Sequence, residues 1–412
     1  MSGRSRFATI VVMQQTELKE RDRKHEANRV DAMRLGGRVA AAVKATCYHE
    51  PAFQIVFLIW CERKLRTEPE EAMPWARNAP RFIAAWQKHE SDSEVWARFL
   101  VRAHVVHAIA ERIAGRPDEA LNAYSRATTA LEAYRDVIPA GDVCDYYHHY
   151  GMYWAHLWCF VRAKIALQRA MQIAKECSLE GTTAALQDVA RSHAFLGALY
   201  GQYGVPAGEA VKMLSAEEQR EHRLQAAYHL GCAVRQLDVN ANRYLADTSL
   251  VNLVAVTTFN KEPTERRAVL AQIEKARVEI RRRTESTSQF TCRLDWLQGL
   301  VHHSLGELDE AADLLRAARN LLIRKKADLL YLIITLDLAE VERTRGNWRT
   351  IRLMAKRLEP VIERCDGKGD PEVDHIRAWR EAVLAHEVDD AKPWPVLDKL
   401  RSCLFNLPGL PS

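Results

Sequence analysis

The sequence predicts an all-α protein, and two observations support that prediction. Apolar residues recur at spacings of three and four from about residue 50 almost to the end of the 412-residue chain, which is typical of amphipathic helices. Only 18 glycines and 14 prolines interrupt them, fewer than an average globular protein carries. The segment 248–259 is rich in β-branched residues, but a buried helix explains it as well as a strand does.

The beginning of the chain differs in character from the rest. Residues 1–16 predict an irregular lead-in, and residues 17–35 predict a charged helix that ends at Gly36 and Gly37. Acidic and basic side chains mix along that helix, as they do on a solvent-exposed helix with pairs four residues apart. We therefore expect a charged N-terminal segment with one helix over residues 1–48, a helical array over 49–385 and a proline-containing tail over 386–412.

Turn residues divide the array into segments of one or two helices each. Glycine and proline end helices because glycine permits a left-handed backbone and proline lacks an N–H donor. The breaks fall at Pro69, Gly115 with Pro117, Pro139 with Gly141, Gly181, Gly204 with Pro206, Pro263, Gly306, Gly346, and Gly367 to Pro371.

Two of these turns match residue by residue. Residues 114–121 read Ala-Gly-Arg-Pro-Asp-Glu-Ala-Leu, and residues 305–312 read Leu-Gly-Glu-Leu-Asp-Glu-Ala-Ala. In each, the glycine suits a left-handed C-cap, and the acidic pair suits the positive N-terminal end of the next helix. The small alanine that follows allows two antiparallel helices to approach closely. The sequence therefore predicts repeated helical hairpins.

These hairpins resemble the tetratricopeptide repeat (TPR), in which small residues occupy fixed positions on both helices. The matching sets are Ala108, Gly115, Ala120, Tyr124 and Ala127; Gly299, Gly306, Ala311, Leu315 and Ala318; Ala339, Gly346, Ile351, Ala355 and Leu358; Tyr147, Tyr150, Gly151, Trp154, Ala163, Leu167 and Ala170; and Trp60, Arg63, Ala72, Ala76 and Ala79. Further pairs occur within 183–280, but their register stays open.

The resemblance covers about residues 50–385 and implies a TPR-like superhelical solenoid of antiparallel helix pairs. Ala72, Ala120 and Ala163 are spaced by 48 and 43 residues, whereas the family repeats every 34. The helices or loops of this chain must therefore be longer. Residues 294–364 also resemble the C-terminal block of uncharacterised bacterial TPR-like proteins.

Charge and cysteine content limit the functional class. The formal net charge is +5, but residues 1–50 hold ten Lys/Arg against six Asp/Glu, a mild excess that does not favour a nucleic-acid partner. Nine cysteines are scattered singly, a pattern typical of reduced thiols in the cytosol. No stretch approaches about 18 uninterrupted apolar residues. We therefore expect a cytoplasmic protein with no membrane span.

Recognisable catalytic motifs are missing from the sequence. It contains no phosphate-binding glycine loop, no G-x-S-x-G turn and no H-E-x-x-H helix. Cys144 and His148 lie four residues apart, a spacing that a metal-binding pair could use, but packing between helices explains them more simply. We expect a protein that is not an enzyme and that binds no cofactor and no metal. The alternative is a helical enzyme that uses Cys144 and His148.

The resemblance also implies where a partner would bind. In TPR proteins the first helix of each pair lines a concave groove that holds a peptide. Transferring the exposed first-helix positions gives Arg102, Val105, Ile109, Arg112, His148, Met152, His156, Arg293, Trp296, Leu300, His303, Leu336, Glu340 and Arg343. No asparagine falls among them, so the family's peptide-carboxylate clamp of Lys, Asn and Arg is not reproduced. The mixed basic and apolar set suggests an acidic, amphipathic partner segment.

Our leading hypothesis is a non-enzymatic protein–protein interaction scaffold or regulatory adaptor that binds a peptide or protein segment in this groove. The alternative is a bacterial regulator that responds to a ligand or nucleic acid through the basic N-terminal segment. In that case binding should weaken steeply with salt and vanish when residues 1–45 are deleted.

Overall fold

The computed structural model describes residues 51–87, 93–179, 181–204, 214–240, 242–260, 265–283, 288–325, 328–365 and 371–385. Their α-helices are connected by turns, and no strand occurs within these ranges. The all-α prediction is therefore confirmed. The N-terminal segment 1–48 with its helix, and the tail 386–412, lie outside the described residues.

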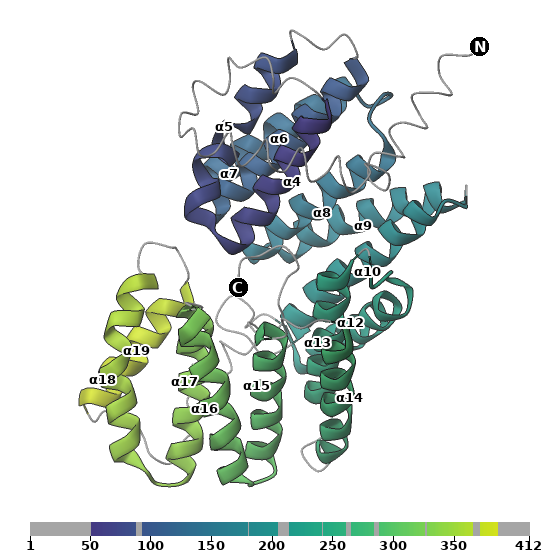
Figure 1. The fold of residues 1–412 in the computed structure, drawn as a ribbon. Helices are drawn as coiled ribbons and strands as arrows, with labels where there is room; N and C mark the ends of the chain where they lie inside the picture. The colour runs from purple at the N-terminus through teal and green to yellow at the C-terminus, as the bar shows by residue number, and fades with distance from the viewer. Residues whose placement is uncertain are drawn as a thin grey trace. The chain divides into compact units, whose positions relative to one another are not determined.

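The described ranges contain helices of 15 to 22 residues (Figure 1). They are α4 (Pro51–Thr67), α5 (Pro69–Gln87), α6 (Ser93–Ile113), α7 (Pro117–Ala133), α8 (Ala140–His156), α9 (Phe160–Ser178), α10 (Thr183–Gly204), α12 (Ala216–Gln236), α13 (Arg243–Asn260), α14 (Arg267–Arg283), α15 (Ser288–Ser304), α16 (Leu308–Lys325), α17 (Asp328–Thr344), α18 (Trp348–Cys365) and α19 (Pro371–Ala385). The β-branched segment 248–259 lies in α13, whose valines are buried, so the helical interpretation is correct.

Successive helices pack as pairs, and each pair has a first and a second helix. The pairs in contact are α4 with α5, α6 with α7, α10 with α12, α13 with α14, α15 with α16, and α17 with α18. Helix α8 pairs with α9 through Gly151, which packs against Leu167. First helices also contact the first helix of the next pair, as α4 contacts α6, α10 contacts α13, and α13 contacts α15. This nearest-neighbour packing is that of a TPR-like helical repeat.

The chain divides into two compact units, and the division falls between His149 and Tyr150 inside α8. The first unit contains α4 to α7 and the beginning of α8. Its core includes Phe57 and Phe82, whose rings meet edge to face with centroids 5.5 Å apart. The second unit contains the end of α8 and all later helices, and its largest fully buried side chain is Trp296.

Four hairpin turns share one backbone geometry. Gly115, Gly306 and Gly346 have φ angles of 70°, 78° and 73°, so the glycine caps predicted from the sequence are confirmed. In each turn the next residue donates its N–H to the carbonyl five residues back, as Arg116 does to Glu111 over 2.9 Å. The turn after α8 makes the same bond, but the left-handed position is occupied by Trp158 with φ 57°.

Small residues set the distance between the helices of a pair. A Cβ on Gly151 would lie 2.7 Å from Leu167, and a Cβ on Gly299 would lie 2.9 Å from Leu315, closer than real Cβ atoms approach. Gly197 occupies the same place against Leu230, at 2.6 Å. The contact between Gly197 and Leu230 therefore fixes the register of the α10/α12 pair, which the sequence left open.

Candidate functional site

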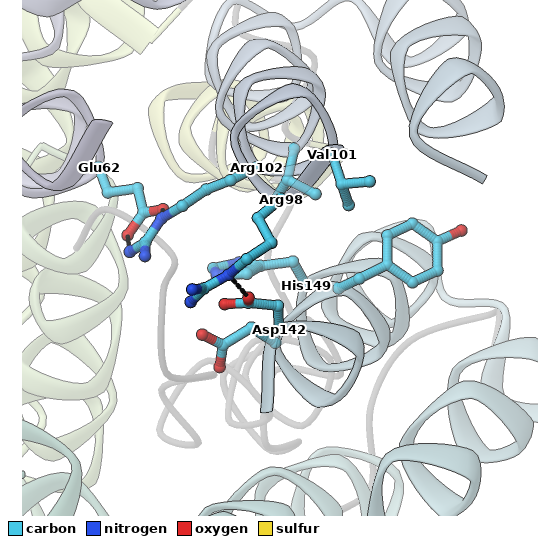
Figure 2. Close-up of a pocket in the computed structure, with 9 residues that line it drawn as sticks. Glu62, Arg98, Val101, Arg102, Asp142 and His149 are labelled. Atoms are coloured by element: carbon cyan, nitrogen blue, oxygen red, sulfur yellow. Dashed lines mark hydrogen bonds and ion pairs between the residues drawn. The ribbon is translucent and has the colours of Figure 1, made fainter. Parts of the chain in front are cut away.

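A cavity in the first unit lies between three consecutive first helices, α4, α6 and α8. Its volume is about 20 Å³, enough for roughly one water molecule. Figure 2 shows its charged side chains converging from these helices. We call it the first-helix cavity, and its lining consists of Glu62, Arg98, Val101, Arg102, Val105, Asp142, Asp145, Tyr146 and His149.

Arg102 of α6 and Glu62 of α4 form a two-pronged ion pair on one side of the cavity. Arg102 donates from Nε to Oε1 over 2.9 Å and from Nη2 to Oε2 over 3.0 Å. Burial would lower the pKa of Arg102, but the carboxylates of Glu62, Asp145 and Asp142 outweigh it and raise that pKa. The paired donors match the carboxylate geometry, which fixes the orientation of both side chains.

Arg98, one turn before Arg102, makes the corresponding contact toward α8. Its Nε donates to the Oδ2 of Asp142 (Figure 2), and both side chains are about five-sixths buried. Spacing of four residues puts Arg98 and Arg102 on one face of α6. The two arginines therefore connect α6 to the first helices on either side of it.

The lining of the first-helix cavity is rich in charged side chains. Three carboxylates, those of Glu62, Asp142 and Asp145, line it together with two guanidinium groups. Carboxylates therefore outnumber guanidinium groups in this lining. Both arginines bind carboxylates of the chain, Arg98 that of Asp142 and Arg102 that of Glu62.

Hydrogen bonds from α7 hold the α8 side of the cavity. Tyr124 donates from its hydroxyl to the carbonyl oxygen of His149 over 3.0 Å. Thr128 donates to the carbonyl oxygen of Tyr124, so the 2.6 Å contact between Thr128 and Tyr146 has the Tyr146 hydroxyl as donor. These bonds fix the first three turns of α8, where the lining residues lie.

The structure corrects the expected exposure of most predicted groove residues. Nine of the fourteen are buried, because first helices pack against one another as well as against their own second helices. The buried ones are Val105, Ile109, Arg112, His148, Met152, Arg293, Trp296, Leu336 and Glu340, and the partly exposed ones are Arg102, His156, Leu300, His303 and Arg343. Only Arg102 and Val105 line the first-helix cavity.

The buried members in the second unit connect first helices to each other. Trp296 of α15 donates from Nε1 to the Oδ2 of Asp337 in α17 over 2.6 Å. Arg293 of α15 donates to the Oδ1 of Asn252 in α13 over 2.7 Å. Burial lowers the pKa of Arg293 to about 10. These residues therefore act in packing between repeats.

Sequence reasoning missed Glu62, Arg98, Asp142 and Asp145 as lining residues. The available signal was weak: two arginines four apart on α6, and two aspartates three apart at the start of α8. Both patterns are common on exposed helices. Their significance depends on pairing between residues 40 and 44 positions apart.

The metal alternative can be compared with the geometry of α8. Cys144 and His148 are both buried, with 1% of each side chain exposed. In the part of the chain that the structure describes, no three His, Cys, Asp or Glu side chains converge on a common point. Nor is any helix there long and apolar enough to cross a bilayer.

Comparisons with known proteins give a structural likeness alone. No protein-family model matches the chain, and no curated protein matches its sequence. Solved structures do match, among them the crystal structure of Rap protein complexed with Competence and Sporulation Factor. That alignment covers 85% of this chain and 86% of the other, with a TM-score of 0.49 and 13% sequence identity.

Proposed function

We propose that this protein is a non-enzymatic interaction scaffold or regulatory adaptor that binds a peptide or protein segment along its first helices. The observation that supports this proposal is the first-helix cavity, which three successive repeats build from ionic side chains. Stacked helix pairs offer such a continuous surface for recognising a chain segment. A cytoplasmic location is part of the proposal and rests on the scattered single cysteines of the sequence.

Binding at this site would work by exchange of ion pairs. The cavity itself admits little more than water, so a partner must lie over it and contact the exposed parts of Arg98, Asp142 and His149. The three carboxylates of the lining, against two arginines, favour a partner segment that presents a lysine or arginine there. A partner cation placed between carboxylates in a half-buried site gains more than one on an open surface.

Affinity purification from the native host, followed by mass spectrometry, tests the proposal. The bait is the full chain, compared with the double variant Arg98→Ala/Asp142→Ala, which removes both members of one ion pair and leaves no unpaired buried charge. We expect the wild type to retain a specific partner that the variant loses.

The matched control is Arg364→Ala/Asp328→Ala, because this pair joins α18 to α17 far along the sequence, with a shortest contact of 2.8 Å. The control should retain the partner. Equal retention by both double variants would contradict a partner site at the first-helix cavity, and substrate turnover by the purified chain would contradict a non-enzymatic scaffold.

A further inference from the structure

The solvent-facing side of α9 carries large apolar side chains. Val161 and Ile165 lie four residues apart, and 67% and 62% of their surfaces are exposed. They are not part of the core stripe of α9, which consists of Ala163, Leu167 and Ala170 with their neighbours. Helix α9 is therefore apolar on two opposite faces, and only one of them is covered by the repeat.

Helix α12 extends this apolar surface. Leu224 and Tyr228 are also four residues apart, and 51% and 61% of their surfaces are exposed. Phe160 stacks on His222 with ring centroids 4.8 Å apart, so the start of α9 lies beside the second turn of α12. Both helices pack on α10 (Figure 1). We call Val161, Ile165, Leu224 and Tyr228 the outer patch.

Exposure of this kind is concentrated in one stretch of the described chain. Of the eight large apolar residues exposed there, six lie between residues 161 and 228: Val161, Ile165, Leu179, Leu186, Leu224 and Tyr228. Scattered single residues of this sort are ordinary, but a cluster on adjacent helices marks an interaction surface.

The charge on the α9 half of the outer patch indicates what kind of partner that half fits, whereas α12 carries three acidic and three basic residues. Helix α9 carries Arg162, Lys164, Arg169 and Lys175 against a single acid, Glu176. Arg162 lies over the ring of Trp154, 4.4 Å from its centroid, which holds this cation beside Val161. A second copy of the chain that paired α9 with α9 would bring like charges together, whereas an acidic partner would meet complementary ones.

We propose that the α9 half of the outer patch docks an acidic amphipathic helix of a partner protein. Apolar side chains of that helix, at positions i and i+4, pack on Val161 and Ile165. Flanking Asp or Glu residues then face the basic residues of α9. This surface consists of second helices, so it is separate from the residues that form the first-helix cavity.

A pair of synthetic peptides tests this proposal. Each has about 18 residues, enough to form a marginal helix in water, with leucines on one face and either glutamate or lysine on the flanks. Fluorescence anisotropy with the full chain should show the glutamate peptide binding at least about tenfold more tightly than its lysine twin. Val161→Ser/Ile165→Ser should weaken binding of the glutamate peptide by about tenfold or more.

The control variant is Val278→Ser/Leu353→Ser, which removes two exposed apolar residues outside the outer patch. It should bind the glutamate peptide like the wild type. Equal binding of both peptides, or equal loss in both variants, would overturn the proposal. So would a dimer in sedimentation velocity that Val161→Ser/Ile165→Ser converts to monomer, since the patch would then serve a second copy. None of these outcomes depends on the first-helix cavity.

Discussion

Trp158 occupies a left-handed backbone position that glycine fills in three equivalent turns. Its φ of 57° is unfavourable for a bulky side chain, at a cost of about 1–2 kcal/mol. Its ring meets that of Tyr203 with centroids 5.5 Å apart, a contact worth about 0.5–1.5 kcal/mol. The aromatic contact therefore offsets strain that the other turns avoid.

Comparing Trp158→Gly with Trp158→Ala separates these two effects. Both variants lose the ring, but only glycine relieves the left-handed backbone. We expect the glycine variant to be about 1 kcal/mol more stable than the alanine variant in urea denaturation. Gly306→Ala is the control, since a Cβ there would meet nothing within 4 Å, and it should lose a similar amount. Equal stability of the two Trp158 variants would contradict the strain assigned to this turn.

Gly197 and Gly231 should respond oppositely to alanine. A Cβ on Gly197 would lie 2.9 Å from the backbone nitrogen of Leu230, which cannot move aside locally, whereas the nearest atom to a Cβ on Gly231 is the flexible end of Arg235 at 3.4 Å. We expect Gly197→Ala to destabilise the protein by about 1–3 kcal/mol. Gly231→Ala should stabilise it by about 0.5–1 kcal/mol through helix propensity. Thermal or urea unfolding measures both, and a destabilising Gly231→Ala would contradict the open space around that residue.

Residue types alone predicted the turns that contain a left-handed glycine, but not the turn in which Trp158 takes that position. Gly115, Gly306 and Gly346 were predictable because only glycine adopts a left-handed cap without strain. Trp158 gave no such signal, since tryptophan is a poor choice for this backbone. Its role depends on a contact with Tyr203, 45 positions later, that no local pattern encodes.

At the scale of helices, α10 and α12 are joined by a pair of histidines. His193 and His229 place their Nδ1 atoms 2.8 Å apart, so one ring donates to the other. Burial lowers the pKa of His229 to about 4, and the positive charges of His193 and Lys175 add to the effect. Burial lowers the pKa of His193 as well, with Lys175 and Arg235 acting in the same direction. Both rings are therefore neutral at pH 7.

This contact should make stability sensitive to mild acid. The unfolded chain takes up these protons near pH 6.5, so the stabilising contribution is complete above that pH and is lost as pH falls toward 4. The free energy of unfolding should fall between pH 7 and pH 5 in both proteins. We expect this fall to be about 1 kcal/mol smaller in His229→Phe than in the wild type, a value that allows for the partial exposure of the ring. Urea unfolding at each pH measures it. Tyr228→Phe should keep the wild-type dependence, and an unchanged slope in His229→Phe would refute the assignment.

Helix pairing was predictable wherever contacting residues lie close in sequence. Gly151 and Gly299 each meet a leucine 16 positions later, so the α8/α9 and α15/α16 pairs follow from a local pattern. Gly197 meets Leu230 after 33 positions because α10 ends at Gly204 and α12 begins at Ala216. The packing is the same there, a glycine of the first helix against a leucine of the second. The longer connection between the two helices made this pair hard to predict.

The candidate site was less predictable than the helices. Spacing indicated which face Arg102 and Val105 share, and both line the first-helix cavity. Spacing could not indicate how closely neighbouring first helices approach. That close approach buries Leu336 and Trp296. Nor could spacing pair Arg98 with Asp142, since ion pairs across repeats leave no periodic signal.

At the scale of the whole molecule, the strongest contacts between described helices join neighbours in the stack, which implies that damage within the second unit stays local. Cooperative opening in such a stack propagates through adjacent interfaces. In hydrogen–deuterium exchange, Gly197→Ala should therefore deprotect α10 and α12 most, α9 and α13 less, and α17 and α18 least. Uniform deprotection of all these helices would show instead that the second unit opens as one block.

The shared turn geometry at Gly115 and Gly306 suggests that these two hairpins can be exchanged. Residues 108–127 and 299–318 have equal length, the same left-handed glycine and the same cap hydrogen bond. A chimera that exchanges the two blocks would keep the chain length, the left-handed glycine and the cap hydrogen bond at both turns. Longer or shorter versions of the protein can therefore be designed by adding or removing hairpins of this geometry.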